Sequence, residues 1–238
     1  MGVLGELLEL VLPQVCAGCG ASPGLLCTGC FGALTCPARP AWPSPVPPGL
    51  PAPWAVAAYG GTVRAMIVAY KESGRTALAH PLGTALARSV LAASARAPGP
   101  PSGFEVPVLV PVPSARAATR ARGHDPALRL ATEAARLLPG AHCVDALVQA
   151  RGVADQAGLT AAARLANLAG ALAVRRAGLR GIKVIVVDDV ITTGASLVEA
   201  ARVLRAADAH VLGAAVIAAT PRRARAPRDQ GNQRRTSE

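Results

Sequence analysis

The sequence predicts an α/β fold in which a mostly parallel sheet carries helices on both faces, preceded by a small cysteine-rich module. Three observations predict it: strand-like and helix-like segments alternate after Trp54, residues 184–187 form a continuous β-branched run, and four of the six cysteines fall between residues 16 and 30. Such alternation builds βαβ crossovers, and a strand buried on both faces reads as a continuous apolar run. With 238 residues, the chain can form one such domain plus an appendage, at roughly 100–200 residues per domain.

Composition supports a folded, basic protein. Hydrophobic residues make up 51% of the chain but aromatic residues only 3%, so the core must consist mainly of Ala, Val and Leu, and disorder throughout is excluded. The net charge is +11, and residues 221–238 supply +4 of it through six arginines and two acids. This tail lacks apolar periodicity, which predicts a disordered basic segment. A basic surface fits nucleic acid, phosphorylated small molecules or no specific ligand.

The N-terminal cysteines have metal-ligand spacing. Cys16 and Cys19 form one C-x-x-C pair, and Cys27 and Cys30 form a second pair after seven intervening residues. Each pair can direct two thiolates at one point, and two pairs complete the tetrahedron of a structural zinc site. The alternatives are disulfides, which a reducing compartment disfavours, and a redox pair, which would not need duplication. We therefore expect residues 1–36 to form an N-terminal helix and a zinc-binding module.

The sequence shows no targeting or membrane segment. The stretch Met1–Val15 lacks a basic start and carries Glu6 and Glu9 among its leucines, unlike a signal peptide. The longest late apolar run, residues 211–219, is far shorter than the roughly 20 residues of a membrane helix. A cytoplasmic protein without a membrane span is the expectation.

Residues 37–53 contain eight prolines in seventeen positions, which predicts an extended, semi-rigid linker because proline fixes φ and lacks a backbone donor. The main domain is expected over residues 54–220. Within it the patterns predict strands at 54–59, 106–112, 143–148, 182–187 and 211–218, and helices at 62–70, 76–96, 126–138, 160–168 and 196–207, with a Gly60-Gly61 turn before the first helix.

The segment VIVVDDVITTGAS, residues 184–196, carries the strongest chemical signal. Its apolar run predicts a central strand, and Asp188 and Asp189 follow at the carboxyl end, where open α/β sheets bind ligands. Small and hydroxyl residues then open an amphipathic helix, whose free backbone N–H groups and dipole favour an anion. Carboxylates can accept hydrogen bonds from vicinal hydroxyls, so a ribose 5-phosphate satisfies both halves of the segment.

Other phosphate-binding motifs are missing from the sequence. It contains neither G-x-x-x-x-G-K-[ST] nor G-x-G-x-x-G opening a helix after a strand, which weakens P-loop and dinucleotide interpretations. A purely structural alternative is a strand-to-helix turn capped by Thr and Ser, with acids favoured by the helix dipole. Helix capping alone does not explain why two adjacent acids and five small loop residues occur together.

These residues resemble the phosphoribosyl pyrophosphate motif of type I phosphoribosyltransferases. The paired cysteines, YKESGR at 70–75, VPVP at 110–113, RARGHDPALRLA at 120–131 and DQAGLTAAARLANL at 155–168 narrow the resemblance to the ComF family. The resemblance implies a type I phosphoribosyltransferase-like domain with an N-terminal zinc module, and a connection with competence and DNA uptake.

The resemblance also implies roles for individual residues. Asp188 and Asp189 would hold the ribose hydroxyls, and Lys71 and Arg122 would lie near pyrophosphate, Arg122 on a loop that closes over it. Where the family usually continues Arg-Gly with Phe-Asn-Gln, this chain has His124-Asp125-Pro126; Gln156, Arg164 and Asn167 match on the acceptor side. The 5′-phosphate would be held by Thr192, Thr193, Gly194, Ala195 and Ser196.

Two classes of function remain open from the sequence. The first is a transferase in which a nitrogen nucleophile displaces pyrophosphate from phosphoribosyl pyrophosphate, assisted by Mg²⁺ bound mainly by substrate oxygens. The second is a non-catalytic regulatory or DNA-associated protein that keeps the ribose-phosphate site, with single-stranded DNA or DNA-uptake proteins as partners. Release of pyrophosphate distinguishes the two classes, and the sequence specifies neither the acceptor nor the oligomeric state.

Overall fold

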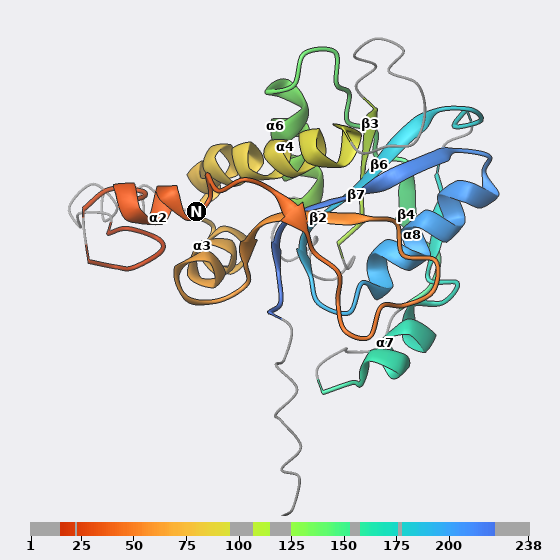
Figure 1. Ribbon diagram of the computed structural model, residues 1–238, viewed down its shortest axis with the longest axis horizontal. Helices are drawn as coiled ribbons and strands as arrows, with labels where there is room; N and C mark the ends of the chain where they lie inside the picture. Colours follow the sequence, from red (N-terminus) through yellow and green to blue (C-terminus); the bar gives the residue numbers. More distant parts are fainter. Residues whose placement is uncertain are drawn as a thin grey trace, which may run out of the picture.

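The computed structural model describes residues 15–21, 23–95, 107–114, 125–152, 158–175 and 178–221. Two sheets organise this part of the chain (Figure 1). The strands are β1 (Arg39–Pro40), β2 (Pro53–Ala58), β3 (Val108–Pro111), β4 (Leu147–Gln149), β5 (Leu172–Val174), β6 (Lys183–Ile191) and β7 (His210–Ala219). The main sheet has the order β1-β2-β7-β6-β3, in which only β1 is antiparallel to its neighbour, while β4 and β5 form a separate antiparallel pair. The predicted mostly parallel α/β sheet is confirmed.

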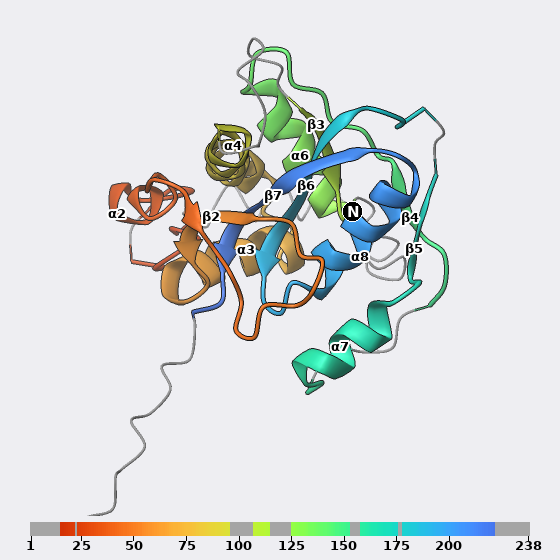
Figure 2. The same cartoon turned by 45° about the vertical axis from the view of Figure 1, so that its right-hand side comes forward.

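Helices cover both faces of the main sheet (Figure 2). The helical elements are α2 (Thr28–Gly32), α3 (Gly61–Glu72), the 3₁₀ turn η1 (Thr76–Leu78), α4 (Ala79–Ala95), α6 (Pro126–Arg136), α7 (Ala161–Leu168) and α8 (Ala195–Ala206). One core cluster joins α3, α4 and α6 to one face of the sheet, and a second joins α8 and the β4-β5 pair to the other. Among the helices of the described ranges, none has the length and apolar character needed to cross a membrane.

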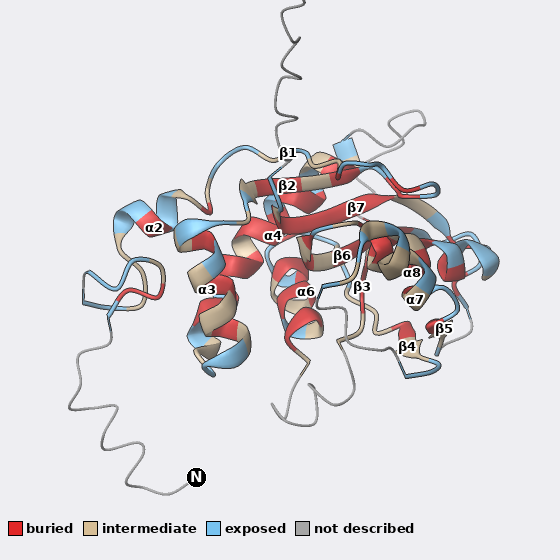
Figure 3. Cartoon of the chain, turned by 90° about the horizontal axis from the view of Figure 1, so that it is seen from below, coloured by how far each residue is buried: buried red, intermediate tan, exposed pale blue. Residues whose placement is uncertain are grey.

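The central strand β6 shows why the sheet must be covered on both sides. Ile185 and Val187 pack in the cluster of α3, α4 and α6, whereas Val184 and Val186 pack in the cluster of α8. All four side chains are at most 1% exposed, which accounts for the continuous apolar run instead of an alternating one. The neighbouring strand β7 is buried from Gly213 to Ala218 (Figure 3) and has four alanines among its ten residues, consistent with the predicted aromatic-poor core.

The strand β3 is short because of its prolines. Its pairing with β6 runs from Val108 to Pro111, and Val112 N–H donates the last ladder bond to Val187 O at 2.9 Å. Pro111 and Pro113 have no N–H, so they cannot extend the ladder. The strand predicted at 106–112 is thus confirmed over its central residues, with Pro107 just outside it.

Other element boundaries differ from the predictions for local reasons. The helix predicted at 76–96 begins as η1 and continues as α4, with Pro81 in the first turn of α4, where a missing N–H costs nothing. The strand predicted at 143–148 is regular only at β4, and Cys143 makes an isolated bridge with Leu109. The sequence analysis did not predict α2, β1 or β5, which span two to five residues each and lack a periodic signal.

The proline-rich residues 37–53, here called the strap, lie against the main domain. The strap contributes β1, which pairs with β2, and Ala52 O accepts a hydrogen bond from Ala214 N–H at 2.9 Å. Five of its side chains are buried: Pro43, Pro47, Leu50, Pro51 and Pro53. The extended backbone expected from its prolines is thus packed along the domain instead of spanning open solvent. The predicted N-terminal helix and the basic tail after residue 221 lie outside the described residues.

The contact between α4 and α6 yields a stability prediction. A Cβ at Gly83 would lie 2.6 Å from Glu133 Cγ and 2.8 Å from Glu133 Cβ, so the two helices pack too closely for a side chain. We expect Gly83→Ala to lower the free energy of unfolding by about 1–3 kcal/mol through overpacking, despite the better helix propensity of alanine. Denaturant unfolding measures this change. In the control Gly32→Ala the new methyl group meets no atom within 4 Å, and an equal loss there would contradict the packing explanation.

Candidate functional site

The two adjacent acids lie inside β6, not after it. The sequence analysis placed the end of the strand at Val187, but β6 continues to Ile191 and stays paired with β7 as far as Ile191 and Ala219. On the other side, β3 ends level with Val187. Asp188 and Asp189 therefore lie beyond the last residue of β3, next to an edge that no strand covers among the described residues.

Lys71, at the end of α3, forms an ion pair with Asp189 Oδ2. The side chain of Asp189 is 7% exposed and that of Lys71 is 30% exposed, so the pair is largely shielded from water. The structure thus brings together Asp188, Asp189 and Lys71, which the sequence analysis assigned to one ligand from segments more than a hundred positions apart.

Burial and charge act on Asp188 in the same direction. Desolvation of its carboxylate is the main cause that raises its pKa well above the ordinary range, followed by the negative charge of Asp189; Lys71 opposes both. The Asp189 N–H donates to Asp188 Oδ1 at 2.8 Å. The two carboxyl groups outnumber the one nearby lysine, and their oxygens can accept hydrogen bonds from hydroxyl groups or bind a cation carried by a ligand.

The loop after β6 ends in an uncapped helix start. Gly194 is the N-cap of α8, has φ of +79° and makes no side-chain capping hydrogen bond. Only a residue without Cβ adopts this left-handed conformation freely, so the sequence requires glycine here. The first turn of α8 contains no acid, and Ala195 N–H donates only a long hydrogen bond of 3.5 Å to Thr193 Oγ1. The start of the helix, with its positive dipole end, therefore suits an anion. Of the predicted phosphate-binding residues, Thr192 is exposed, Thr193 and Ser196 are half-buried, and Gly194 and Ala195 are buried.

A hydrogen-bonded group that the sequence analysis missed lies at the start of α6. Asp125 accepts hydrogen bonds from Ser114 Oγ at 2.9 Å and from the N–H groups of Ala127 and Leu128 at 2.9 and 3.3 Å. Asp125 is thus the N-cap of α6 and Pro126 its first residue, the signature of a helix start. This explains locally why Asp-Pro can stand where the resembling family has other residues.

Tyr70 connects this group to α3. Its buried hydroxyl donates to Pro126 O at 3.2 Å. Tyr70 directly precedes Lys71, the lysine that pairs with Asp189. Burial raises the pKa of Tyr70 to about 12, so it remains a donor at any physiological pH. Arg122, predicted to close over pyrophosphate, and Gln156 lie outside the described residues.

Helix α7 lies across the start of α8. Leu165 and Leu168 pack with Ala195, which places α7 beside the candidate phosphate loop. Arg164 on α7 has a buried Nε without a hydrogen-bond partner, and the main-chain O of Asn167 accepts from Arg151 at 2.8 Å. Glu199 of α8 accepts from Leu172 N–H at 3.4 Å, which holds the β4-β5 pair to the same helix.

A separate groove of about 530 Å³ lies between the start of α4 and α6. Asp125 and Arg129 line one part, and His80 and Glu133 form a 2.9 Å contact in its wall. The residues assigned to ribose and phosphate are not among those that line it.

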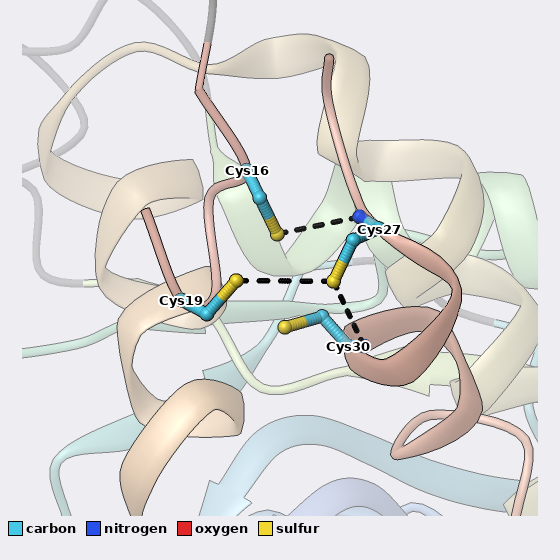
Figure 4. A group of neighbouring side chains, drawn as sticks. All are labelled: Cys16, Cys19, Cys27 and Cys30. Atoms are coloured by element: carbon cyan, nitrogen blue, oxygen red, sulfur yellow. Dashed lines mark hydrogen bonds between the residues drawn. The ribbon is translucent and has the colours of Figure 1, made fainter. Parts of the chain in front are cut away.

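The four predicted metal ligands converge on one point (Figure 4). The sulfur atoms of Cys16, Cys19, Cys27 and Cys30 all lie within 4.8 Å of one another, and the Sγ atoms of Cys19 and Cys27 are 3.8 Å apart. Two thiolates bound to a tetrahedral zinc ion at 2.3 Å would be separated by about 3.8 Å. This geometry fits zinc, with α2 supplying Cys30 and the preceding turn supplying Cys16 and Cys19.

The thiols of this cluster also differ in their affinity for protons. Backbone donors, chiefly at Cys19 and Cys27, lower the pKa of Cys16 to about 5. Burial and the neighbouring cysteine side chains raise the pKa of Cys30 to about 12. Four thiolates cannot coexist this closely without a cation, and a dication removes that repulsion.

A comparison with protein families identifies the class of the domain. The phosphoribosyl transferase domain model matches residues 125–233, a range that begins at the N-cap of α6 and includes Asp188, Asp189 and the loop to α8. The chain thus carries a phosphoribosyltransferase-like domain, in agreement with its mostly parallel sheet and helices on both faces. No curated protein matches the chain.

The two acids should respond oppositely to neutralisation. At neutral pH we expect Asp188→Asn to raise the free energy of unfolding by about 1 kcal/mol, because a carboxyl group whose ionisation is opposed by desolvation and by Asp189 is replaced by a neutral amide. Asp189→Asn should lower it by about 2 kcal/mol, less than for a fully buried pair because Lys71 is partly exposed. Denaturant unfolding of both variants makes the comparison.

The effect of Asp188 on stability should depend on pH. Because the folded chain holds the Asp188 proton to a higher pH than the unfolded chain does, stability falls as pH rises from about 4 toward the raised pKa. The gain from Asp188→Asn should therefore shrink as pH falls from the raised pKa to about 4, below which Asp188 is protonated in both the folded and the unfolded chain. A gain that stayed constant over this range would mean that charge is not its cause.

The cysteine cluster should retain metal. We expect protein expressed with zinc to contain about one zinc ion per chain, and Cys27→Ser to lose most of it and to unfold at a lower temperature. Elemental analysis and thermal unfolding measure both effects. Cys36→Ser is the matched control, since Cys36 is exposed and outside the cluster. Equal zinc contents in the two variants would contradict the four-ligand assignment.

Proposed function

We propose that this chain binds phosphoribosyl pyrophosphate and transfers its phosphoribosyl group to a nitrogen acceptor. The observation that carries the proposal is a group of charged side chains beside the loop that leads into α8. Asp188 and Asp189 lie near the end of the strand before this loop, Lys71 pairs with Asp189, and the N-cap Gly194 has no side chain to cap the helix. Carboxylates suit ribose hydroxyls, and the start of α8 suits the 5′-phosphate. The phosphoribosyl transferase domain match over residues 125–233 supports the same assignment.

In this proposal the acceptor nitrogen forms a bond to the anomeric carbon while the bond from that carbon to pyrophosphate breaks. Asp188 and Asp189 stabilise the positive charge that develops on the ribosyl group, and Lys71 and Arg122 stabilise the charge of the leaving pyrophosphate. Thr192 to Ser196 orient the 5′-phosphate. Mg²⁺ carried by the substrate oxygens would withdraw charge from the leaving group, and the excess of carboxylates over lysine at the site fits such a hard cation.

The domain organisation is part of the proposal. Residues 1–36 would form the zinc module, 37–53 the strap, 54–220 the phosphoribosyltransferase-like domain and 221–238 a basic tail. The ComF resemblance favours a role in competence and DNA uptake, and a cytoplasmic location fits that role.

A second candidate is a non-catalytic regulator or DNA-associated protein that retains the ribose-phosphate site. The net charge of +11 favours it, since contacts with phosphates depend on basic side chains.

The primary test is calorimetric titration of phosphoribosyl pyrophosphate with Mg²⁺ into the wild-type protein and an Asp188→Asn/Asp189→Asn variant. Loss of both carboxylate charges should weaken binding by roughly 2–5 kcal/mol, as for other charged partners of a buried hydrogen bond. Asp208→Asn is the matched control, because Asp208 is exposed and asparagine tolerates its φ of 59°.

The outcomes separate the candidates. The ribose-phosphate site is supported if the double variant loses binding and Asp208→Asn keeps it. Pyrophosphate release with a panel of amines and bases then tests phosphoribosyl transfer. Binding without release for any acceptor favours the regulatory candidate. Absence of binding to the wild type contradicts the ribose-phosphate assignment and leaves salt-sensitive DNA binding to be measured.

A further inference from the structure

We propose that Leu50 of the strap, supported by Pro47, is a positioning residue for the candidate phosphate loop. The inference rests on the proposed function, and it extends the site to a segment far outside the matched residues 125–233. Leu50 contacts no ligand in this proposal. It acts through Gly194, whose conformation sets the direction of the first N–H groups of α8.

The contact between the strap and the loop is direct. A Cβ built on Gly194 would lie 3.1 Å and 3.2 Å from the two terminal methyl carbons of Leu50 and 3.5 Å from Pro47 Cγ. Leu50 is 9% exposed and belongs to the core cluster that contains Leu197 and Ala200 of α8. The leucine methyl groups thus occupy the space where any other residue at position 194 would carry its side chain.

The strap is held firmly enough to support the loop. Arg205 Nη1 on α8 donates to Gly49 O at 2.9 Å, one residue before Leu50. On the other side of Leu50, Ala52 O accepts from Ala214 N–H on β7 at 2.9 Å. These two bonds fix the backbone to the helix and the sheet that flank the loop, and the buried Pro47 and Pro51 restrict φ on either side of Leu50.

Gly194 needs such support because little else holds its backbone in place. It has a left-handed φ of +79° and no side chain of its own to cap α8, and Thr193 Oγ1 accepts only a long hydrogen bond of 3.5 Å from Ala195 N–H. Glycine is the residue with the widest choice of φ and ψ, so without an external contact the loop could sample other conformations. A leucine packed beside the position that a Cβ of Gly194 would take favours the one conformation in which the N–H groups at the start of α8 converge on an anion.

The test compares Leu50→Ala with Val46→Ala, a strap residue whose side chain is 51% exposed. In the ligand-free protein, amide hydrogen exchange over residues 192–198 should become faster in Leu50→Ala and remain unchanged in Val46→Ala. The affinities for ribose 5-phosphate and for phosphoribosyl pyrophosphate with Mg²⁺ should fall together, by between about ten- and a hundredfold. Leu50→Met, which conserves volume, should restore most of the affinity.

Each result decides the inference. If Leu50→Ala binds both ligands like the wild type, or if it lowers thermal stability without changing exchange at 192–198, Leu50 has only a structural role and the inference is overturned. If Leu50→Ala does not fold, Pro47→Ala replaces it in the same measurements. A wild-type protein that binds neither ligand overturns the proposed function itself. Failure of the wild type to bind either ligand can be distinguished from failure of Leu50 to affect the loop, because amide hydrogen exchange over residues 192–198 is measured without ligand.

Discussion

The unequal length of the strands that flank β6 is the constraint on which the site depends. On one side β7 pairs with β6 as far as Ile191, and on the other side β3 stops level with Val187 because Pro111 and Pro113 cannot donate to the ladder. The two acids follow immediately after this point. Lys71 then reaches Asp189 from α3, on the face of the sheet toward which Ile185 and Val187 also point.

The N-terminal part of the chain completes a site whose motif lies in the C-terminal part. Three contacts cross between them: Lys71 pairs with Asp189, Tyr70 donates to Pro126 O, and Leu50 packs on Gly194. The family match begins at Asp125, so the first partner of each contact lies outside it. The matched residues supply the acids and the loop, and the preceding residues supply the lysine and the packing that hold them in place.

The sequence predicts best what depends on neighbouring residues. The β6 strand, the loop and α8 follow from a continuous apolar run, glycine and an amphipathic repeat, and the cysteine cluster follows from two short turns. Spacing alone could not place Lys71 beside Asp189; only the family resemblance put it near the ligand. The sequence analysis also missed the packing role of Leu50, since a leucine between prolines gives no periodic signal. It missed the capping role of Asp125 as well, although the Asp-Pro signature of a helix start was present. The end of β6 was misplaced because two aspartates are poor strand formers, and pairing with β7 overrides that preference.

The cysteine module shares its packing with the candidate site. Cys16 and Cys30 are 2% and 4% exposed and belong to the same core cluster as Met66 and Tyr70 of α3. At Gly18 a Cβ would lie 3.3 Å from Thr62 Cβ in the first turn of that helix. The other end of α3 carries Lys71. One helix therefore rests on the cysteine cluster at its start and supplies the cation for Asp189 at its end, so the module acts as part of the scaffold of the site and not as an independent appendage.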